Sequence, residues 1–366
     1  ASSVICGVTT QSKTRAPSID HSRGVIAHGL VRGVMVNAGN ANAFTGIEGA
    51  NAVSRCALYL AQKIGSSKYE IAIGSTGVIG EKLEYDALLK CVDQLLNNPP
   101  KADFEMAAKA IMTTDTFAKG AYSEALLGSK KVKICGIAKG SGMIAPNMAT
   151  MMAYIITDAV IDSKVMQRCL NGAVKKSFNA ISVDSDTSTS DLCLCIATGK
   201  ASNRLIDDFN DPHLDDFRQA LEEVCFDLAM HIIGDGEGIG KLIEVCVRGA
   251  ENRQAAQKIA RSIIDSPLVK VAIGAGDANW GRVVMAAGKS GEAMERDRMC
   301  IYFGDHLVAE NGSVCPSYVE ADLQPYLEGD HIKITLDTGL GGQGCFTMWG
   351  NDLGTDYVAI NGAYRS

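Results

Sequence analysis

The chain has 366 residues, of which 46% are hydrophobic and 21% are charged, and its formal net charge is −7. This length suits one large layered domain with a smaller lobe, and the composition is that of a globular protein rather than a disordered or fibrous one. An acidic chain offers no basic surface for nucleic acid, so we do not expect a nucleic-acid partner.

The sequence also indicates the cellular compartment in which the protein is found. No apolar run approaches the roughly 20 residues that cross a bilayer, and the first residues lack a secretory signal pattern. We therefore expect a cytoplasmic protein, or one of an organelle matrix in a eukaryote, with no membrane partner. The 12 cysteines are scattered, and Cys193 and Cys195 have no second close pair that would complete a zinc site. Buried, reduced cysteines are the expectation.

The predicted elements alternate between strands and helices. Short apolar stretches that end in Gly, Asn, Ser or another turn residue predict strands over residues 29–37, 69–75, 131–137 and 192–198. Apolar residues at helical spacing predict helices over 48–64 and 214–233. The pattern indicates a mixed α/β fold.

Two further strands are predicted near the end of the chain, over residues 331–336 and 345–349. The glycines between them, over 339–344, fit the spacing G-x-G-x-x-G. A dinucleotide site needs a helix directly after these glycines, whereas the sequence that follows them predicts a strand. We therefore predict a hairpin turn that joins the two strands.

Residues 136–159 read GIAKGSGMIAPNMATMMAYIITDA. Pro146 prevents a helix from running through this segment, and Thr150 then opens an apolar run. From these residues alone, Thr150 is a β-branched residue at the start of a buried strand.

The same segment resembles the cleavage-site signature of the ornithine acetyltransferase family, also called the glutamate N-acetyltransferase or bifunctional arginine biosynthesis family. In that family the Ala-Thr bond within N-M-A-T-M is cut autocatalytically. Other blocks resemble the family in the family's order and together cover nearly the whole chain, namely residues 36–42, 75–80, 111–116, 178–191, 234–238, 266–270, 277–282 and 360–366.

The resemblance implies a chain that cuts itself between Ala149 and Thr150. The products, residues 1–149 and 150–366, are expected to stay together and to pair into a complex of two of each. The implied fold is a layered α-β-β-α sandwich with a smaller α/β lobe around residues 245–335. Cleavage would free the α-amine of Thr150, whose reference pKa of about 7.7–8.0 allows it to act as the base for its own hydroxyl.

The resemblance also implies the site residues. Thr76 and Gly77 would stabilise the oxyanion from a position just past the strand over 69–75. The implied substrate-binding residues are Thr113, Lys139, Thr150, Glu237, Asn361 and Ser366. We assign Lys139 to a carboxylate and Glu237 to an ammonium group. Without the resemblance, Thr76 and Gly77 would be an ordinary strand end, Lys139 a solvated lysine and Glu237 a turn residue. A role for Asn361 and Ser366 predicts that the chain end folds back over the pocket.

Asp184, Asp186 and Asp191 stand among Ser and Thr residues and raise the alternative of a cation site. Their spacing lacks the glycine at position six and the acidic residue at position twelve of a calcium loop, so loop or capping hydrogen bonds are favoured. None of the six histidines lies in an H-x-x-x-H pair, and no metal is expected.

The expected reaction moves the acetyl group of N-acetylornithine to glutamate through an acetylated Thr150, without a cofactor. The sequence does not decide whether acetyl-CoA is also a donor, whether the acceptor is that of arginine biosynthesis or of a related secondary-metabolite pathway, or whether residues precede Ala1. The alternatives are a self-cleaving aminopeptidase or amidase of the same fold, and a non-enzymatic binding module. Intact Thr76, Gly77, Lys139, Thr150 and Glu237 argue against the binding module.

Overall fold

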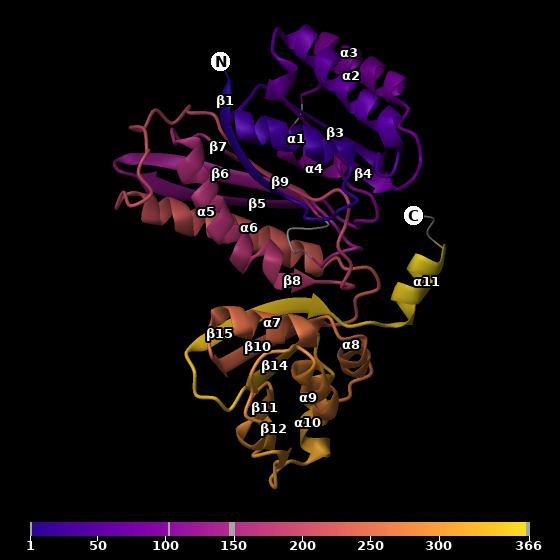
Figure 1. Ribbon diagram of the computed structural model, residues 1–366, viewed down its shortest axis with the longest axis vertical. Helices are drawn as coiled ribbons and strands as arrows, with labels where there is room; N and C mark the ends of the chain where they lie inside the picture. The colour runs from indigo at the N-terminus through magenta and orange to yellow at the C-terminus, as the bar shows by residue number, and fades with distance from the viewer. Residues whose placement is uncertain (1, 102, 146–150, 364–366) are drawn as a thin grey trace. The chain divides into compact units, whose positions relative to one another are not determined.

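The computed structural model describes residues 2–101, 103–145 and 151–363, which form two compact units (Figure 1). The first unit comprises the described residues up to Asn179 together with Asp186–Asp235. The second comprises Ala180–Ser185 and residues 236–363. Within these ranges, no helix is both long and apolar enough to span a bilayer.

The first unit is built on a six-stranded sheet in the order β2-β1-β9-β7-β6-β5. Neighbouring strands are antiparallel except β7 and β9, which are parallel. Every residue of β9 is buried, which explains its uninterrupted apolar sequence LCLCIA. The strands are β1 Ser3–Thr9, β2 Leu30–Val31, β5 Lys119–Leu127, β6 Lys130–Lys139, β7 Met152–Thr157 and β9 Leu192–Ala197.

Both faces of this sheet are covered, which gives four layers (Figure 1). Helices α5 and α6 pack on one face. The parallel pair β3 and β4 packs on the other, in a core that joins Leu194 to Ala72 and Val34. A further core, formed by Val53 of α2 and Ile73 of β4, attaches the outer helices. These elements are α1 Pro17–His28, β3 Gly33–Asn40, α2 Gly46–Ile64, β4 Ile71–Val78, α3 Tyr85–Asn97, α4 Phe104–Ala110, α5 Ser163–Lys176 and α6 Leu214–Ile233.

The second unit has a seven-stranded sheet in the order β13-β12-β11-β14-β10-β15-β8. Its core lies between the sheet and the helices that follow β10. The strands are β8 Ile181–Ser182, β10 Leu242–Ala250, β11 Cys300–Phe303, β12 His306–Glu310, β13 Ser313–Val314, β14 His331–Asp337 and β15 Gly344–Asn351. The helices are α7 Arg253–Ile264, α8 Pro267–Gly274, α9 Trp280–Gly288, α10 Glu320–Leu327 and α11 Thr355–Ala363.

The predicted mixed α/β class and the α-β-β-α layering are confirmed. Helix α6 has the predicted bounds, and α2 begins two residues earlier than predicted. The predicted strand over 29–37 is interrupted, because Gly29, with φ of 80°, ends α1 and the strand β3 begins only at Gly33. The left-handed conformation at Gly29 is the usual end of a helix and is not a strand conformation.

The predicted hairpin over residues 339–344 is wrong. Strands β14 and β15 both form, but β10 lies between them, parallel to β14 and antiparallel to β15. The glycines instead allow the segment between β14 and β15 to pass close to the backbone at the end of β10. Gly342 donates its N–H to the carbonyl of Gly249 at 3.0 Å, and a Cβ on Gly342 would lie 2.1 Å from the carbonyl oxygen of Ala250. Only glycine fits so close to another backbone.

Candidate active site

Lys139, the last residue of β6, lies in a cluster of hydroxyl groups within the first unit. Its ammonium donates to Thr113 Oγ1 at 2.6 Å and to Thr76 Oγ1 at 3.5 Å. Lys139 is only 8% exposed, so it is not a solvated surface lysine. The fold therefore brings together three residues that the sequence assigns to the site, from β4, β6 and the connection between α4 and β5.

A buried network of charges lies directly behind this cluster. Lys119 has no exposed surface, and its ammonium donates to Asp115 Oδ1 at 2.7 Å and to the carboxylate of Asp235. Asp235 also accepts the backbone N–H of Thr116 at 3.0 Å. Asp115 Oδ2 lies 3.9 Å from Lys139 Nζ, so two cations are balanced by two carboxylates. A buried charge is tolerable only with such compensation.

Asp115 also fixes the backbone around Lys139. Its carboxylate accepts the N–H of Gly140 at 2.7 Å and the N–H of Thr113 at 3.0 Å. Burial alone raises the pKa of Asp115, but the charges of Lys139 and Lys119 and the Gly140 N–H outweigh it and hold the pKa below its usual value. Asp115 is therefore a carboxylate that orients Thr113 and Lys139.

Thr76 and Gly77 lie inside β4, and not just past the strand as predicted. They pair with Ala38 and Gly39 of β3 in a parallel register. Gly77 has φ of 128°, and a Cβ there would lie 2.2 Å from the carbonyl carbon of Gly39. The strand continues because glycine tolerates both this conformation and this close approach. The role of Thr76 and Gly77 as oxyanion donors stays a prediction.

Glu237 and Asn361 meet within the second unit. Glu237 lies in the turn two residues after Asp235, and Asn361 of helix α11 donates its side-chain N–H to Glu237 Oε2 at 2.9 Å. Asp352, just before α11, accepts the backbone N–H groups of Gly240 and Lys241 at 2.8 and 2.9 Å. These contacts connect the turn that carries Glu237 to the segment that carries Asn361.

Three of the residues assigned from the sequence, Ala149, Thr150 and Ser366, lie outside the described residues. The next described residue is Met151, and its carbonyl accepts the N–H of Leu192 at 3.0 Å. Met152 then pairs with Lys139 on one side and with Leu192 on the other. The chain directly after Thr150 therefore lies at the centre of the six-stranded sheet, beside the strand that ends in Lys139.

The sequence analysis missed Asp115, Lys119 and Asp235. Asp115 and Asp235 stand in the blocks over residues 111–116 and 234–238, but only their neighbours carried an expected role. Lys119 looks like an ordinary strand residue. Its role depends on a contact with Asp235 across 116 residues of sequence, which no local pattern predicts.

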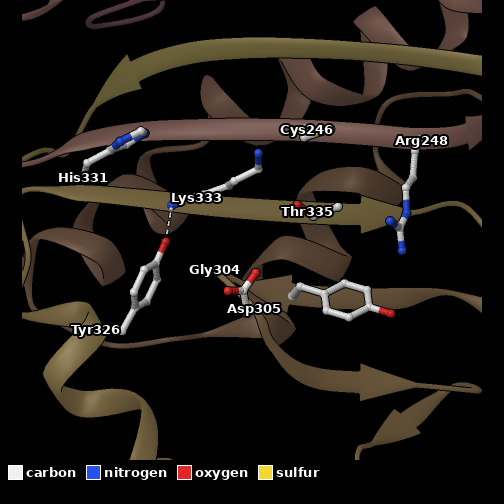
Figure 2. Close-up of a pocket in the computed structure, with 9 residues that line it drawn as sticks. Cys246, Arg248, Gly304, Asp305, Tyr326, His331, Lys333 and Thr335 are labelled. Carbon is white, nitrogen blue, oxygen red and sulfur yellow. Dashed lines mark hydrogen bonds between the residues drawn. The ribbon is translucent and has the colours of Figure 1, made fainter.

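A separate cavity of about 600 Å³ lies on the second unit's sheet and contains none of the residues assigned from the sequence (Figure 2). Its two long cations are already paired, Arg248 with Asp337 at 3.1 Å and Lys333 with Glu244 at 2.9 Å. It therefore offers no uncompensated positive charge to an anion. Among the described residues, no group of three His, Cys, Asp or Glu side chains could hold a metal.

Comparisons with known proteins agree with the resemblance read from the sequence. The model of the ArgJ family matches residues 1–366. Two relatives named arginine biosynthesis bifunctional protein ArgJ are 48% identical, from Rhizobium meliloti (strain 1021), and 47% identical, from Bartonella quintana (strain Toulouse). Each alignment covers 99% of this chain and 88% of the relative. A crystal structure of the protein of that name from Bacillus halodurans is 40% identical with a TM-score of 0.55, over 58% of this chain and 98% of that chain. The chain therefore belongs to the ArgJ family.

Proposed function

We propose that this chain is an acetyltransferase of arginine biosynthesis, which cuts itself between Ala149 and Thr150 and then moves the acetyl group of N-acetylornithine to glutamate through an acetylated Thr150. Family membership and the names of the relatives support this pathway. The observation that carries the proposal is the buried ammonium of Lys139, held against Thr113 and Thr76 beside the strand that follows Thr150.

Both substrates carry an α-carboxylate, and Lys139 supplies a cation for it. Because Lys139 is buried, a carboxylate binds it in a medium of low dielectric constant, where a charge-assisted hydrogen bond is strong. Glu237 supplies the anion for a substrate ammonium group, and the amide of Asn361 orients its carboxylate. The family resemblance adds the hydroxyl groups of Thr113, which accepts from Lys139, and of Ser366 to the residues proposed to bind substrate.

In the first half-reaction, the Thr150 hydroxyl attacks the acetyl carbonyl of N-acetylornithine and passes its proton to the Thr150 α-amine. Thr76 and Gly77 stabilise the oxyanion. The C–N bond of the substrate breaks, and ornithine leaves with the proton from the α-amine. In the second half-reaction, the amine of glutamate attacks the acetyl ester, and N-acetylglutamate and free Thr150 result. Contacts to the charged groups of glutamate hold its amine against the ester, so that it reacts faster than water.

The order of strands supports continued association of the cut chains. Strand β6 precedes the proposed cut and β7 follows it, yet the two are hydrogen-bonded neighbours from Ile134–Thr157 to Lys139–Met152. Strand β1 likewise pairs with β9. Each product would expose the edge of a buried sheet if it left, so we propose that the products remain one folded body and that such bodies pair.

An acetyl-transfer assay with site variants tests the proposal. Lys139→Met and Glu237→Gln should each lower kcat/KM for N-acetylornithine by about 10- to 100-fold, because each removes a hydrogen bond to a charged group. Lys176→Met, which removes an exposed lysine that pairs with Glu222, should leave kcat/KM unchanged. Wild-type kcat/KM in both site variants would contradict the proposal. The same assay with acetyl-CoA in place of N-acetylornithine tests the second activity that the word bifunctional implies in the relatives' names.

A further inference from the structure

Lys270 of helix α8 is a buried lysine of the second unit that the proposed mechanism does not use. It is 2% exposed, and its ammonium donates to the backbone carbonyl of Asn351, the last residue of β15. Burying an ammonium group is costly even when it has partners, so the position of this lysine calls for an explanation. The carbonyl that it holds points to one.

The residue after Asn351 is connected to the turn over residues 236–241. Asp352 accepts the backbone N–H groups of Gly240 and Lys241 at 2.8 and 2.9 Å. Its own N–H donates to the carbonyl of Lys241 at 3.0 Å. The chain at the end of β15 is therefore held both by α8 and by this turn.

Glu237 lies within the same turn, between two glycines that approach the end of the chain closely. A Cβ on Gly236 would lie 2.4 Å from the side-chain nitrogen of Asn351. A Cβ on Gly238 would lie 2.3 Å from the backbone nitrogen of Tyr357, in the first turn of helix α11. The turn that carries Glu237 is therefore packed directly against the end of β15 and the start of α11.

Helix α11 contacts this turn a second time through Asn361, whose amide donates to Glu237 Oε2 at 2.9 Å. Residues 352–354 alone separate β15 from α11 (Figure 1), so a displacement of Asn351 would be passed on to the helix. A hydrogen bond weakens steeply as its geometry departs from the ideal. A small shift of α11 would therefore release the Glu237 carboxylate.

We propose that Lys270 is a positioning residue for substrate binding, which holds the end of β15 so that Asn361 stays on Glu237 and the carboxylate keeps the orientation in which it binds an ammonium group. This inference rests on the proposed function, in which Glu237 binds the ammonium group of a substrate. Lys270 touches no substrate and acts through Asn351, Asp352 and α11.

The kinetics of acetyl transfer at neutral pH test the effect on substrate binding. Lys270→Met has no donor, so the KM for N-acetylornithine should rise by about 10-fold, the equivalent of about one hydrogen bond. The kcat should change little, because Glu237 binds the ground state and the transition state alike. Adding Lys270→Met to Glu237→Gln should raise KM no further, because Lys270 acts through Glu237. The control is Lys258→Met, which removes an exposed lysine of α7 paired with Glu292 and should leave KM unchanged.

Hydrogen exchange followed by mass spectrometry tests the same role without an activity. In Lys270→Met, the amides of residues 236–241 and 351–363 should exchange faster than in the wild-type chain, whereas those of the strand pair β11 and β12 should not. Asp352→Ala breaks the same connection at its other end and should have the same effects on exchange and on KM. The test therefore does not depend on the folding of a single variant.

Wild-type exchange in both variants, a wild-type KM in both, or an increase in KM that adds to that of Glu237→Gln would each overturn the proposal. A fall in kcat without a rise in KM would assign Lys270 a general structural role and would also overturn it. If the wild-type chain transfers no acetyl group, the proposed function fails instead, and hydrogen exchange alone decides whether Lys270 holds the end of β15 and α11.

Discussion

Two buried lysines of the first unit lie against specific carboxylates. Lys119 and Lys139 are both within reach of Asp115, and Lys119 also contacts Asp235. Exposed ion pairs contribute little to stability, whereas removing one member of a buried set leaves an uncompensated charge in a medium of low dielectric constant. The stability of the first unit and the charge of its candidate site therefore depend on the same four residues.

Replacing Lys119 should reveal this dependence. Lys119→Met should lower the free energy of unfolding by about 3–5 kcal/mol, because Asp115 and Asp235 lose their shared cation. Adding Asp235→Asn should restore part of the loss, so the two changes should not be additive in urea unfolding. The exposed control Lys176→Met should change the free energy by about 1 kcal/mol or less. Additive losses would contradict the coupling.

Lys270 should give the second unit a distinct pH dependence. Burial lowers the pKa of this lysine from 10.5 to about 8, although Asp265, Asp184 and Asp352 oppose the shift, and its ammonium donates to the carbonyl of Asn351. Between these two values the folded chain has lost the proton while the unfolded chain keeps it. The unfolded state then binds more protons, so the stability contributed by this group rises with pH.

The measurement compares the wild-type chain with Lys270→Met, since other groups that titrate in this range affect both. The wild-type chain should gain stability relative to the variant between pH 8 and pH 10.5, by at most about 3 kcal/mol. A difference that stays constant over this range would show that Lys270 keeps its ordinary pKa.

At the scale of single residues, the sequence predicts which side chains belong to the candidate site better than it predicts whether they are buried. The resemblance identified Thr76, Thr113 and Lys139, and the fold brings them together. It did not indicate that Lys139 is buried, because burial depends on packing between β4, β6 and the α4–β5 connection. The sequence favoured loop hydrogen bonds for the acidic run that includes Asp191, and the backbone carbonyl of Asp191 accepts the N–H of Thr10 at 3.0 Å.

At the scale of elements, strand β4 carries Thr76 and Gly77, the two residues proposed to stabilise the oxyanion. The strand stays paired with β3 through Gly77, where the two backbones come closer than any side chain allows. Thr76 is thereby held at the end of a buried parallel pair and within 3.5 Å of Lys139 Nζ. A donor on a rigid strand keeps its direction better than one on a loop.

Gly77→Ala should disturb this arrangement. The backbone strain at a φ of 128° alone should cost about 1–3 kcal/mol, and kcat should fall more than KM changes, because the displaced groups act on the oxyanion rather than on bound substrate. The matched control is Gly24→Ala in the exposed part of α1, where a Cβ meets nothing within 4 Å. That change should instead stabilise the chain by about 0.5–1 kcal/mol. Wild-type kcat in Gly77→Ala would exclude the strand as the source of the donors.

The elements themselves could be predicted wherever a regular pattern extended over many residues. Helix α6 and strand β9 were predicted to within one residue. The predictions that were wrong concern which strands are hydrogen-bonded neighbours in a sheet. Residues 339–344 looked like a hairpin turn because the sequence between two strands does not show whether a distant strand enters between them, and here β10 does.

At the scale of the whole molecule, the proposed cut falls within the sheet that holds the first unit together. Strands β7 and β9, which follow the cut, are neighbours in the middle of the sheet, with β1 and β2 on one side and β5 and β6 on the other, all four of which precede the cut. A chain that cut itself there would keep its fold, because the hydrogen bonds between strands replace the lost covalent link. The boundaries of the two compact units, at residues 180–185 and 236, are independent of this position.

Mass spectrometry of the purified protein, with and without N-acetylornithine, tests the central claim most directly. The account predicts two chains, one that ends at Ala149 and one that begins at Thr150. It also predicts that N-acetylornithine adds the mass of one acetyl group to the second chain and that glutamate removes it. A single uncut chain that transfers acetyl groups at full rate, or an acetyl group on any residue other than Thr150, would contradict it.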